Sequence, residues 1–317
     1  MKKNIILLNP SSGRNRAIKN KDRLEKLLAE NKIDYELFVS KSEQDLRGLI
    51  QENFPHAKSL IAAGGDSTFT ILINEMSMVQ KKIPVGIIPL GSSDDIALEY
   101  NIKNLTDAVK AIKEGKTKKT DVGVIKAPGS FLYYFPGQAN VGIGASVNKF
   151  VASNQGNQIL SGIQGMYEAF KNKRVPQDFT IEFDRQKIQG NFISLLFSKI
   201  KYWAGGRLFL PGATIDDGKI HLLSIEGRNG RPFKEFVEIL KIMLKSKKGK
   251  HIDNKYVKVY KSEKFSISSS QEFIIQVDGD IIQESPGKSK DKKFKKIEVG
   301  ILKKQIDVIY NTWISKY

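Results

Sequence analysis

Residues 59–72 read S-L-I-A-A-G-G-D-S-T-F-T-I-L, an apolar run that ends in two glycines, an aspartate and two hydroxyl residues. The run at 59–63 is typical of a short buried strand, and the apolar residues that resume from Phe69 predict a helix over 68–78. A glycine-rich loop between such elements indicates either a tight turn or a backbone built to lie against phosphate groups. Patterns elsewhere in the sequence are needed to choose between these two interpretations.

The alternation of strand and helix extends through the first third of the chain. Strand-like runs stand at 3–9, 35–39 and 83–90, and helical patterns stand at 17–30, at 44–53 and from residue 94 onward. Repeated strand–helix units predict a doubly wound parallel sheet with helices on both faces. Ligands of such sheets bind beyond the carboxyl ends of the strands, where the glycine-rich loop lies.

The pattern changes after about residue 121. Short β-like runs follow one another between Gly, Pro, Asn and Asp residues, which predicts an antiparallel β-sandwich or barrel. Helical patches at 162–171 and 231–245 interrupt them, and the second carries an apolar stripe that favours core packing, with lipid contact as the alternative. We therefore expect a nucleotide-binding α/β domain at 1–122, a β-sandwich substrate domain at 123–295 with a cleft between them, and a segment at 296–317 that returns to the N-terminal domain.

Composition excludes several kinds of chemistry. The 317 residues contain no cysteine and only three histidines, so disulfides, thiolate nucleophiles, cysteine zinc sites and a histidine metal cluster are not expected. The apolar run near the start is stopped by Asn9-Pro10, too early for a signal peptide, and no stretch is long enough to cross a bilayer. We expect a cytoplasmic protein that is soluble or at most peripheral to a membrane.

Charge points to an anionic partner. Lysine and arginine total 52 against 34 acidic residues, a net charge of +18, which attracts polyanions. Two solvated loops would explain the lysine clusters, but two clusters in one half of the chain favour an anionic membrane surface at the inner face. Nucleic acid is not expected, because zinc-finger spacing and RNP-type aromatic motifs are missing from the sequence. The clusters are Lys245, Lys247, Lys248, Lys250, Lys255 and Lys258, then Lys288, Lys290, Lys292, Lys293, Lys295 and Lys296.

Three loops that combine glycine with hydroxyl residues follow three of the expected strands. They are N-P-S-S-G-R at 9–14, G-G-D-S-T at 64–68 and P-L-G-S-S-D-D at 89–95. Glycine lets backbone N–H groups converge, hydroxyls donate to phosphate oxygens, and the helices that follow offer their positive ends. Because parallel strands end at one sheet edge, the three loops together predict a phosphate site there.

The common nucleotide and acyl-transfer motifs do not match. The glycines at 142 and 144 are not followed by a third at the spacing of the dinucleotide fingerprint, and 212–219 lacks the spacing of a Walker loop. The sequence also contains no G-x-S-x-G motif that would supply a serine nucleophile.

The order and spacing of the three loops resemble the diacylglycerol kinase catalytic-domain family, which includes bacterial lipid kinases and sphingosine kinases. The usual forms in that family are N-P-x-S-G, G-G-D-G-T and P-L-G-T-x-N-D. The resemblance continues with A-N-V-G-I-G at 139–144, G-G-R at 205–207, P-G-A-T-I-D-D-G at 211–218 and V-D-G-D at 277–280. It therefore covers essentially the whole chain.

The resemblance implies an ATP-dependent lipid kinase of phospholipid metabolism, with Mg²⁺ and a lipid hydroxyl as acceptor. It implies Asp280 as the general base, and Asp66 facing the phosphates or their magnesium. It implies a structural magnesium held by Asp217 with the main-chain carbonyls of Thr214 and Lys219. The nucleotide site that it implies comprises Asn9, Ser12, Gly13, Ser40, Gly64, Gly65, Asp66, Ser67, Thr68, Gly91 and Ser92.

From the residues alone, β-turns are the preferred interpretation at Asp217 and Asp280, because D-G is a favoured hairpin turn. Ser67 stands where the family has glycine, Asp94 where it has asparagine, and Asp280 where it has glutamate. These departures leave a catalytically silent nucleotide- or lipid-binding regulator as the alternative, and NAD kinase, which shares a G-G-D-G loop, as a less favoured one. The acceptor lipid and the oligomeric state, a homodimer included, stay open.

Overall fold

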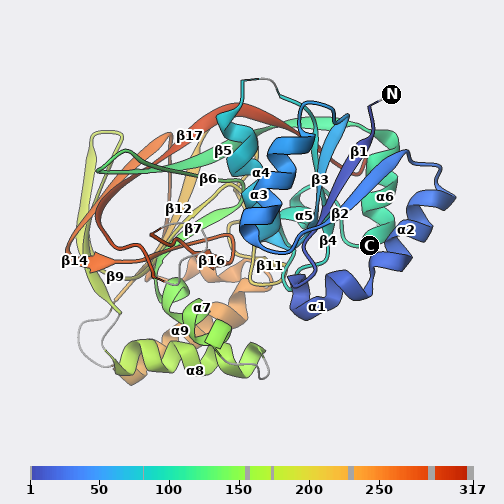
Figure 1. Ribbon diagram of the computed structural model, residues 1–317. Helices are drawn as coiled ribbons and strands as arrows, with labels where there is room; N and C mark the ends of the chain where they lie inside the picture. The colour runs from blue at the N-terminus through green and yellow to red at the C-terminus, as the bar shows by residue number, and fades with distance from the viewer. Residues whose placement is uncertain are drawn as a thin grey trace.

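The computed structural model describes residues 2–80, 82–153, 158–172, 175–227, 232–284 and 290–312. Its N-terminal part is a parallel sheet in the order β4-β3-β1-β2, with helices around it (Figure 1). The elements are β1 (Asn4–Leu8), α1 (Ser12–Lys19), α2 (Lys21–Glu30), β2 (Tyr35–Val39), α3 (Glu43–Asn53), β3 (Ser59–Gly64), α4 (Asp66–Met78), β4 (Val85–Pro89), α5 (Asp95–Glu99) and α6 (Leu105–Glu114).

The central strands of this sheet are apolar because both of their faces are covered. Every residue of β1, β3 and β4 is buried, and these strands share one hydrophobic core with the inner faces of α2, α4 and α6. Continuous apolar runs are the expected signature of parallel strands that are covered by helices on both sides. The carboxyl ends of β1, β3 and β4 therefore bring the three glycine-rich loops to one edge.

The C-terminal part is an antiparallel β-sandwich with a second core of its own, to the left in Figure 1. Its strands are β5 (Thr117–Ala127), β6 (Phe131–Phe135), β7 (Gln138–Gly142), β8 (Gln177–Phe183), β9 (Gln186–Ser198), β10 (Tyr202–Trp203), β11 (Arg207–Leu208), β12 (Ile220–Glu226), β13 (Val257–Ser262), β14 (Lys264–Phe273), β15 (Ile275–Val277), β16 (Asp280–Ile281) and β17 (Phe294–Ile309). Its helices are α7 (Ile143–Ser153), α8 (Gln158–Lys171), α9 (Pro232–Ser246) and the 3₁₀ turn η1 (Lys250–Asp253). Residues of the three α-helices form a third apolar cluster with β9 and β12.

Strand β17 belongs to both halves of the molecule. Its first part pairs with β14 and β5 in the sandwich, and its last part pairs with β5 and lies parallel to β4 at Val308 and Val85. Figure 1 shows this strand as a long red ribbon that runs from the sandwich to the N-terminal sheet. The two sheets are consequently joined by one continuous hydrogen-bonded path.

The expected fold class is confirmed: a parallel-sheet α/β domain is followed by an antiparallel β-sandwich. Two local expectations need correction. The helix expected over 17–30 is two helices that meet at Asn20, and residues 13–15, inside the first of them, have left-handed backbone angles. Helix α7 was not among the helices expected after residue 121. The domain boundaries stay a prediction.

Candidate active site

The first and second glycine-rich loops meet at Thr68, in the first turn of α4. The Asn9 amide donates to the Thr68 hydroxyl over 3.1 Å, and the Ser12 hydroxyl lies 3.2 Å from the same atom. Thr68 is buried, whereas Asn9 and Ser12 are partly exposed. Residues from the ends of β1 and β3 therefore hold each other in one polar cluster.

Glycine is required where these loops touch. A Cβ added to Gly91 would overlap the Gly65 Cα and lie 2.6 Å from an Asp94 carboxylate oxygen. A Cβ on Gly13, which has a φ of +61°, would overlap the carbonyl oxygen of Leu90. The loops pack backbone against backbone, as the absence of side chains at these positions permits. The close approach of the loops is therefore possible only because these positions carry no side chain.

Asp66, the first residue of α4, ties the second loop to the third. Its carboxylate accepts hydrogen bonds from the backbone N–H groups of Asp95, over 3.1 Å, and Ile96, over 2.9 Å, at the start of α5. Burial raises the pKa of Asp66 well above its ordinary value, and the nearby Asp95 carboxylate raises it further. The Asp66 carboxylate thus joins the second loop to the third in this structure.

The aspartate at 94, where the family has asparagine, is paired. Asp94 has a left-handed backbone, with a φ of +55°, and one carboxylate oxygen accepts from the Gly91 N–H over 2.8 Å. The other oxygen accepts from the Arg16 guanidinium over 2.7 Å. The additional negative charge is therefore compensated within the site by a cation from α1.

Helix α5 also connects the two domains. The Asp95 carboxylate accepts from the backbone N–H groups of Gly205 and Gly206, in the G-G-R stretch, over 3.2 and 2.6 Å. One turn later, Glu99 accepts from both the backbone N–H and the ammonium of Lys201, each over 3.1 Å. The third loop and α5 are thus joined by hydrogen bonds both to Asp66 of the second loop and to the second domain.

A polar stripe on α4 faces the second domain. The Thr70 hydroxyl donates to Asp278 over 2.7 Å, and the Asn74 amide both donates to and accepts from the backbone of Tyr134 in β6, over 2.7 and 3.0 Å. Asp278 also accepts from the backbone N–H groups of Gly137 and Gln138. The sequence analysis missed Thr70, Asn74 and Asp278, although polar residues spaced four apart in an apolar helix were a visible signal.

Asp280 lies opposite the start of this stripe. It begins strand β16, and its carboxylate lies beside the Ser67 side chain of the second loop. Asp280 is exposed to solvent in part, yet burial by the protein around its carboxylate is the main cause that raises the pKa of Asp280. The Ser67 side chain lowers that pKa, and the negative charge of Glu43 raises it.

The stability of the domain junction should depend on pH through Asp278. Burial raises the pKa of Asp278 to about 7 in the folded protein, against about 3.9 in an unfolded chain. Between these values the folded state keeps a proton that the unfolded chain releases, so this group's contribution to stability falls as pH rises from about 4 to 7. We expect the melting temperature of the wild type, relative to Asp278→Asn, to decline between about pH 5 and 7.5. Parallel melting curves for the two proteins over this range would contradict the assignment.

Two further predicted nucleotide residues lie near the loops without joining the Thr68 cluster. Ser40 follows β2 and is buried, with its backbone N–H and its hydroxyl directed to the Leu8 carbonyl over 2.9 and 3.3 Å. Ser92 is exposed at the tip of the third loop. The structure therefore gathers Asn9, Ser12, Gly13, Gly64–Thr68 and Gly91 most closely. The roles of these residues toward ATP stay predictions.

The residues predicted to hold a structural magnesium lie elsewhere, at the start of β12. Asp217 and the Lys219 carbonyl are close together, and both accept hydrogen bonds from the ammonium of Lys199. Thr214 is partly buried in the same loop. In the described part of the chain, no group of three or more His, Cys, Asp or Glu side chains is arranged to hold a metal.

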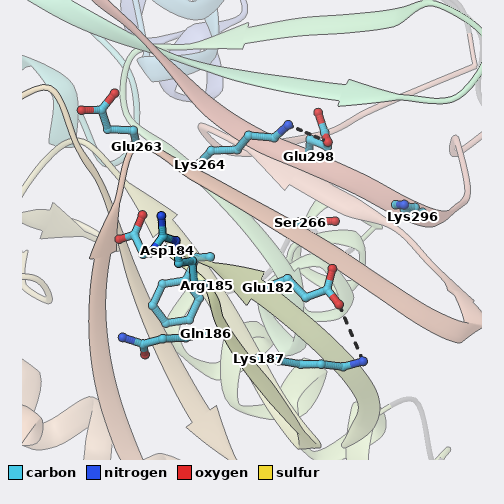
Figure 2. Close-up of a pocket in the computed structure, with 11 residues that line it drawn as sticks. Glu182, Asp184, Arg185, Gln186, Lys187, Glu263, Lys264, Ser266, Lys296 and Glu298 are labelled. Atoms are coloured by element: carbon cyan, nitrogen blue, oxygen red, sulfur yellow. Dashed lines mark ion pairs between the residues drawn. The ribbon is translucent and has the colours of Figure 1, made fainter.

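A separate groove opens on the outer face of the sandwich and does not include the loops (Figure 2). Its charged side chains are balanced in sign, four acidic and four basic, and two of its ion pairs join Lys187 to Glu182 and Lys264 to Glu298. The charged residues that line it are Glu182, Asp184, Arg185, Lys187, Glu263, Lys264, Lys296 and Glu298. Such balanced, mutually paired charges favour neither an anionic nor a cationic ligand.

Comparison with known proteins agrees with this architecture. The family profile of the diacylglycerol kinase catalytic domain matches residues 3–125, and that of the YegS C-terminal NAD kinase beta sandwich-like domain matches residues 137–299. A diacylglycerol kinase of Staphylococcus carnosus is 27% identical over 238 residues, covering 73% of this chain and 72% of that one. One from Staphylococcus aureus is 26% identical over 288 residues, covering 87% and 85%.

A crystal structure of a diacylglycerol kinase from Bacillus anthracis has the same fold. It superposes with a TM-score of 0.69 at 16% identity, over 98% of this chain and 97% of that chain. The α/β domain with its three glycine-rich loops and the β-sandwich joined to it correspond to the two domains that these family profiles describe. The chain belongs to the diacylglycerol kinase catalytic-domain family.

Proposed function

We propose that this protein transfers the γ-phosphoryl group of Mg-ATP to the hydroxyl of a lipid, diacylglycerol or a related molecule, at the inner membrane face. In this proposal residues 1–122 bind the nucleotide and residues 123–295 bind the lipid. The observation that carries it is the hydrogen bond from Thr70 of α4 to Asp278 over 2.7 Å, which holds the V-D-G-D turn against α4 and sets Asp280 beside Ser67 of the second loop. That contact sets a carboxylate beside the loop where a nucleotide's phosphates would lie.

The loops fit a nucleotide's phosphates. The start of α4 supplies backbone N–H groups and a positive helix end, and glycine at 64, 65 and 91 lets the loops pack closely around that start. The hydroxyls of Ser12 and Thr68 stand beside it. Magnesium that arrives with ATP supplies neutralisation of phosphate charge. We assign Asp66 to positioning, since both of its carboxylate oxygens already accept from the N–H groups that open α5.

Asp280 would take the proton from the attacking hydroxyl as the phosphoryl group moves to it. A general base is most effective when its pKa approaches the working pH, and burial shifts Asp280 in that direction. Aspartate is one methylene shorter than the glutamate usual in the family, and serine at 67 is larger than the usual glycine. The two departures contact each other, so we propose that the Ser67 hydroxyl holds the shorter base in place.

A surface for the membrane lies on the helices next to this base. Helix α7 contacts β16, which carries Asp280, and also packs against α8, which in turn packs against α9. Within the apolar stripe expected on α9, Phe236, Leu240 and Met243 are partly buried against the core, whereas Phe233 and Leu244 are 70% and 72% exposed. We call the following exposed residues the α8–α9 surface: Leu160, Tyr167, Phe233, Lys234, Lys241, Leu244 and Lys245.

Exposed apolar side chains among lysines are the composition of a helix that rests on anionic lipid. Figure 1 shows α8 and α9 side by side, on the side of the molecule away from β17. The T-shaped contact of Tyr167 with Phe236, at 5.9 Å between ring centroids, fixes the two helices as one surface. We propose that this surface docks on the membrane and brings the lipid hydroxyl toward Asp280. No helix in the described residues is long and apolar enough to span a membrane.

Binding to vesicles tests the α8–α9 surface. Binding to anionic vesicles should weaken steeply as salt rises, because each lysine near the surface contributes about 1 kcal/mol that salt screens. Replacing Phe233 and Leu244 together by serine should lower the affinity at least about tenfold, since each apolar side chain that enters lipid contributes more than about 1 kcal/mol. Met78→Ser, another exposed apolar residue that lies in the α/β domain, is the control. Equal binding to neutral and anionic vesicles, or an unaffected double variant, would refute the docking surface.

Melting temperature and label transfer together test the reaction. Mg-ATP should stabilise the purified protein, and γ-labelled ATP should label a lipid from a panel of diacylglycerol, sphingoid bases, polyprenols and phosphatidylglycerol. Label on NAD would support an NAD kinase instead. Stabilisation by Mg-ATP without label on any acceptor would support a silent regulator.

A further inference from the structure

Lys199 is a fully buried cation in the middle of the molecule. It follows strand β9, its side chain has 0% exposure, and its ammonium donates to three acceptors. These are the Asp217 carboxylate at 2.9 Å, the Lys219 carbonyl at 2.5 Å and the Asp121 carboxylate at 3.3 Å. An ammonium has three N–H donors, so each of them is satisfied.

The acceptors around Lys199 are themselves fully engaged. Asp121 accepts from the backbone N–H groups of Gly218, over 2.7 Å, and Lys304, over 2.9 Å. Asp217 accepts from the Lys261 ammonium over 3.1 Å and from Nε2 of His221 over 2.8 Å. Two carboxylates thus face two ammonium groups, those of Lys199 and Lys261. The cluster is close to neutral as it stands.

A magnesium ion does not fit this cluster. Magnesium binds oxygen at about 2.1 Å, so an ion that contacts both Asp217 and the Lys219 carbonyl would lie within about 5 Å of the Lys199 nitrogen. It would compete for oxygens that already accept from the ammonium, and it would add two positive charges to a nearly neutral, largely buried cluster. The oxygen atoms of Asp217 and Lys219 that were predicted to bind a structural metal therefore already accept hydrogen bonds from Lys199.

We propose that the Lys199 ammonium takes the place of the structural magnesium that the family resemblance implies. Asp121 lies on β5 and Lys304 on β17, the two strands that connect the sandwich to the α/β domain. Lys199 therefore holds the junction of the domains with a cation that belongs to the chain. The folded structure needs no free metal at this position, and magnesium enters with the nucleotide alone.

Melting of the nucleotide-free wild type tests this directly. We expect the same melting temperature, within about 1 °C, in EDTA and in millimolar magnesium, because an ion that binds only the folded state would raise it. Elemental analysis after dialysis without nucleotide should find less than stoichiometric magnesium. A magnesium-dependent rise in the wild type that Asp217→Asn abolishes would overturn the proposal, as would one tightly bound ion per chain.

The variant Lys199→Ala supplies the complementary result. Removing the ammonium leaves two buried carboxylates without their shared cation, so the melting temperature should fall by at least about 5 °C. Magnesium should then recover part of the loss in a concentration-dependent way, and adding Asp217→Asn to Lys199→Ala should remove that recovery. Lys118→Ala, which breaks the exposed 3.1 Å pair with Asp216, is the matched control and should show neither effect.

If Lys199→Ala folds and its melting temperature does not rise with magnesium, the proposal that the ammonium occupies the place of a magnesium ion is contradicted. If that variant does not fold, the wild-type melting curves and metal content still decide the matter. None of these measurements uses ATP or lipid, so their outcome is independent of the proposed kinase reaction.

Discussion

Asp280→Asn is expected to lower kcat for lipid phosphorylation at least about a hundredfold, as the loss of a general base does. The amide cannot take a proton from the acceptor hydroxyl, although it has nearly the shape of the carboxylate and can still accept from Ser67. The affinity for Mg-ATP should change little, because Asp280 belongs to the second domain and is not among the residues proposed to bind the phosphates of the nucleotide. Steady-state rates and ATP titrations on the same preparation separate the two quantities.

Two companion variants make this expectation specific. Asp280→Glu should retain activity, and Ser67→Gly combined with Asp280→Glu restores the pair that is usual in the family. Ser67→Ala should slow the Asp280 enzyme more than it slows the Asp280→Glu enzyme, since the hydroxyl is proposed to hold the shorter side chain. Retention of most of the activity in Asp280→Asn would remove Asp280 from the chemistry.

Gly91→Ala is expected to lower kcat/KM for ATP by about a hundredfold, because a displacement of about 1 Å in a positioned site costs that much. The added Cβ would overlap the Gly65 Cα and approach the Asp94 carboxylate at 2.6 Å, so the third loop must move away from the phosphate loop. Gly65→Ala should be milder, since its Cβ would lie 3.0 Å from the Gly91 Cα.

Glycines in open surroundings are the controls for this substitution. A Cβ on Gly48, in α3, or on Gly162, in α8, would meet no atom within 4 Å. Alanine there should leave ATP kinetics unchanged and slightly favour the helix. Normal ATP kinetics in Gly91→Ala would show that the close packing of the loops is not needed for nucleotide binding.

Much of the secondary structure can be predicted from the sequence, because strands, helices and turns depend mainly on residues that are close together in the chain. The strand–helix alternation of the first third and the short β-runs that follow give the confirmed fold class, and parallel strands bring their three loops to one edge. The roles of the loops and of Asp280 were predicted from the family resemblance. Without that resemblance, V-D-G-D predicts only a turn.

Contacts across long sequence separations could not be predicted in the same way. Lys199, at the end of β9, meets Asp121 of β5, 78 residues away, only because the folded sheets bring these two strands together. Thr70 and Asp278 are 208 residues apart and meet where α4 packs on the sandwich. A lysine within L-L-F-S-K-I was a visible signal of a buried cation, but nothing in the sequence names its acceptors.

Transfer of label from γ-labelled Mg-ATP to a lipid hydroxyl is the most direct test of the central claim. The protein should be presented with each lipid of the panel in anionic vesicles at low salt, with Asp280→Asn in parallel. We expect one lipid to be labelled by the wild type, with at least about a hundredfold less label from the variant. The kinase proposal fails if the wild type binds Mg-ATP yet labels no lipid, and if Ser67→Gly with Asp280→Glu restores no transfer.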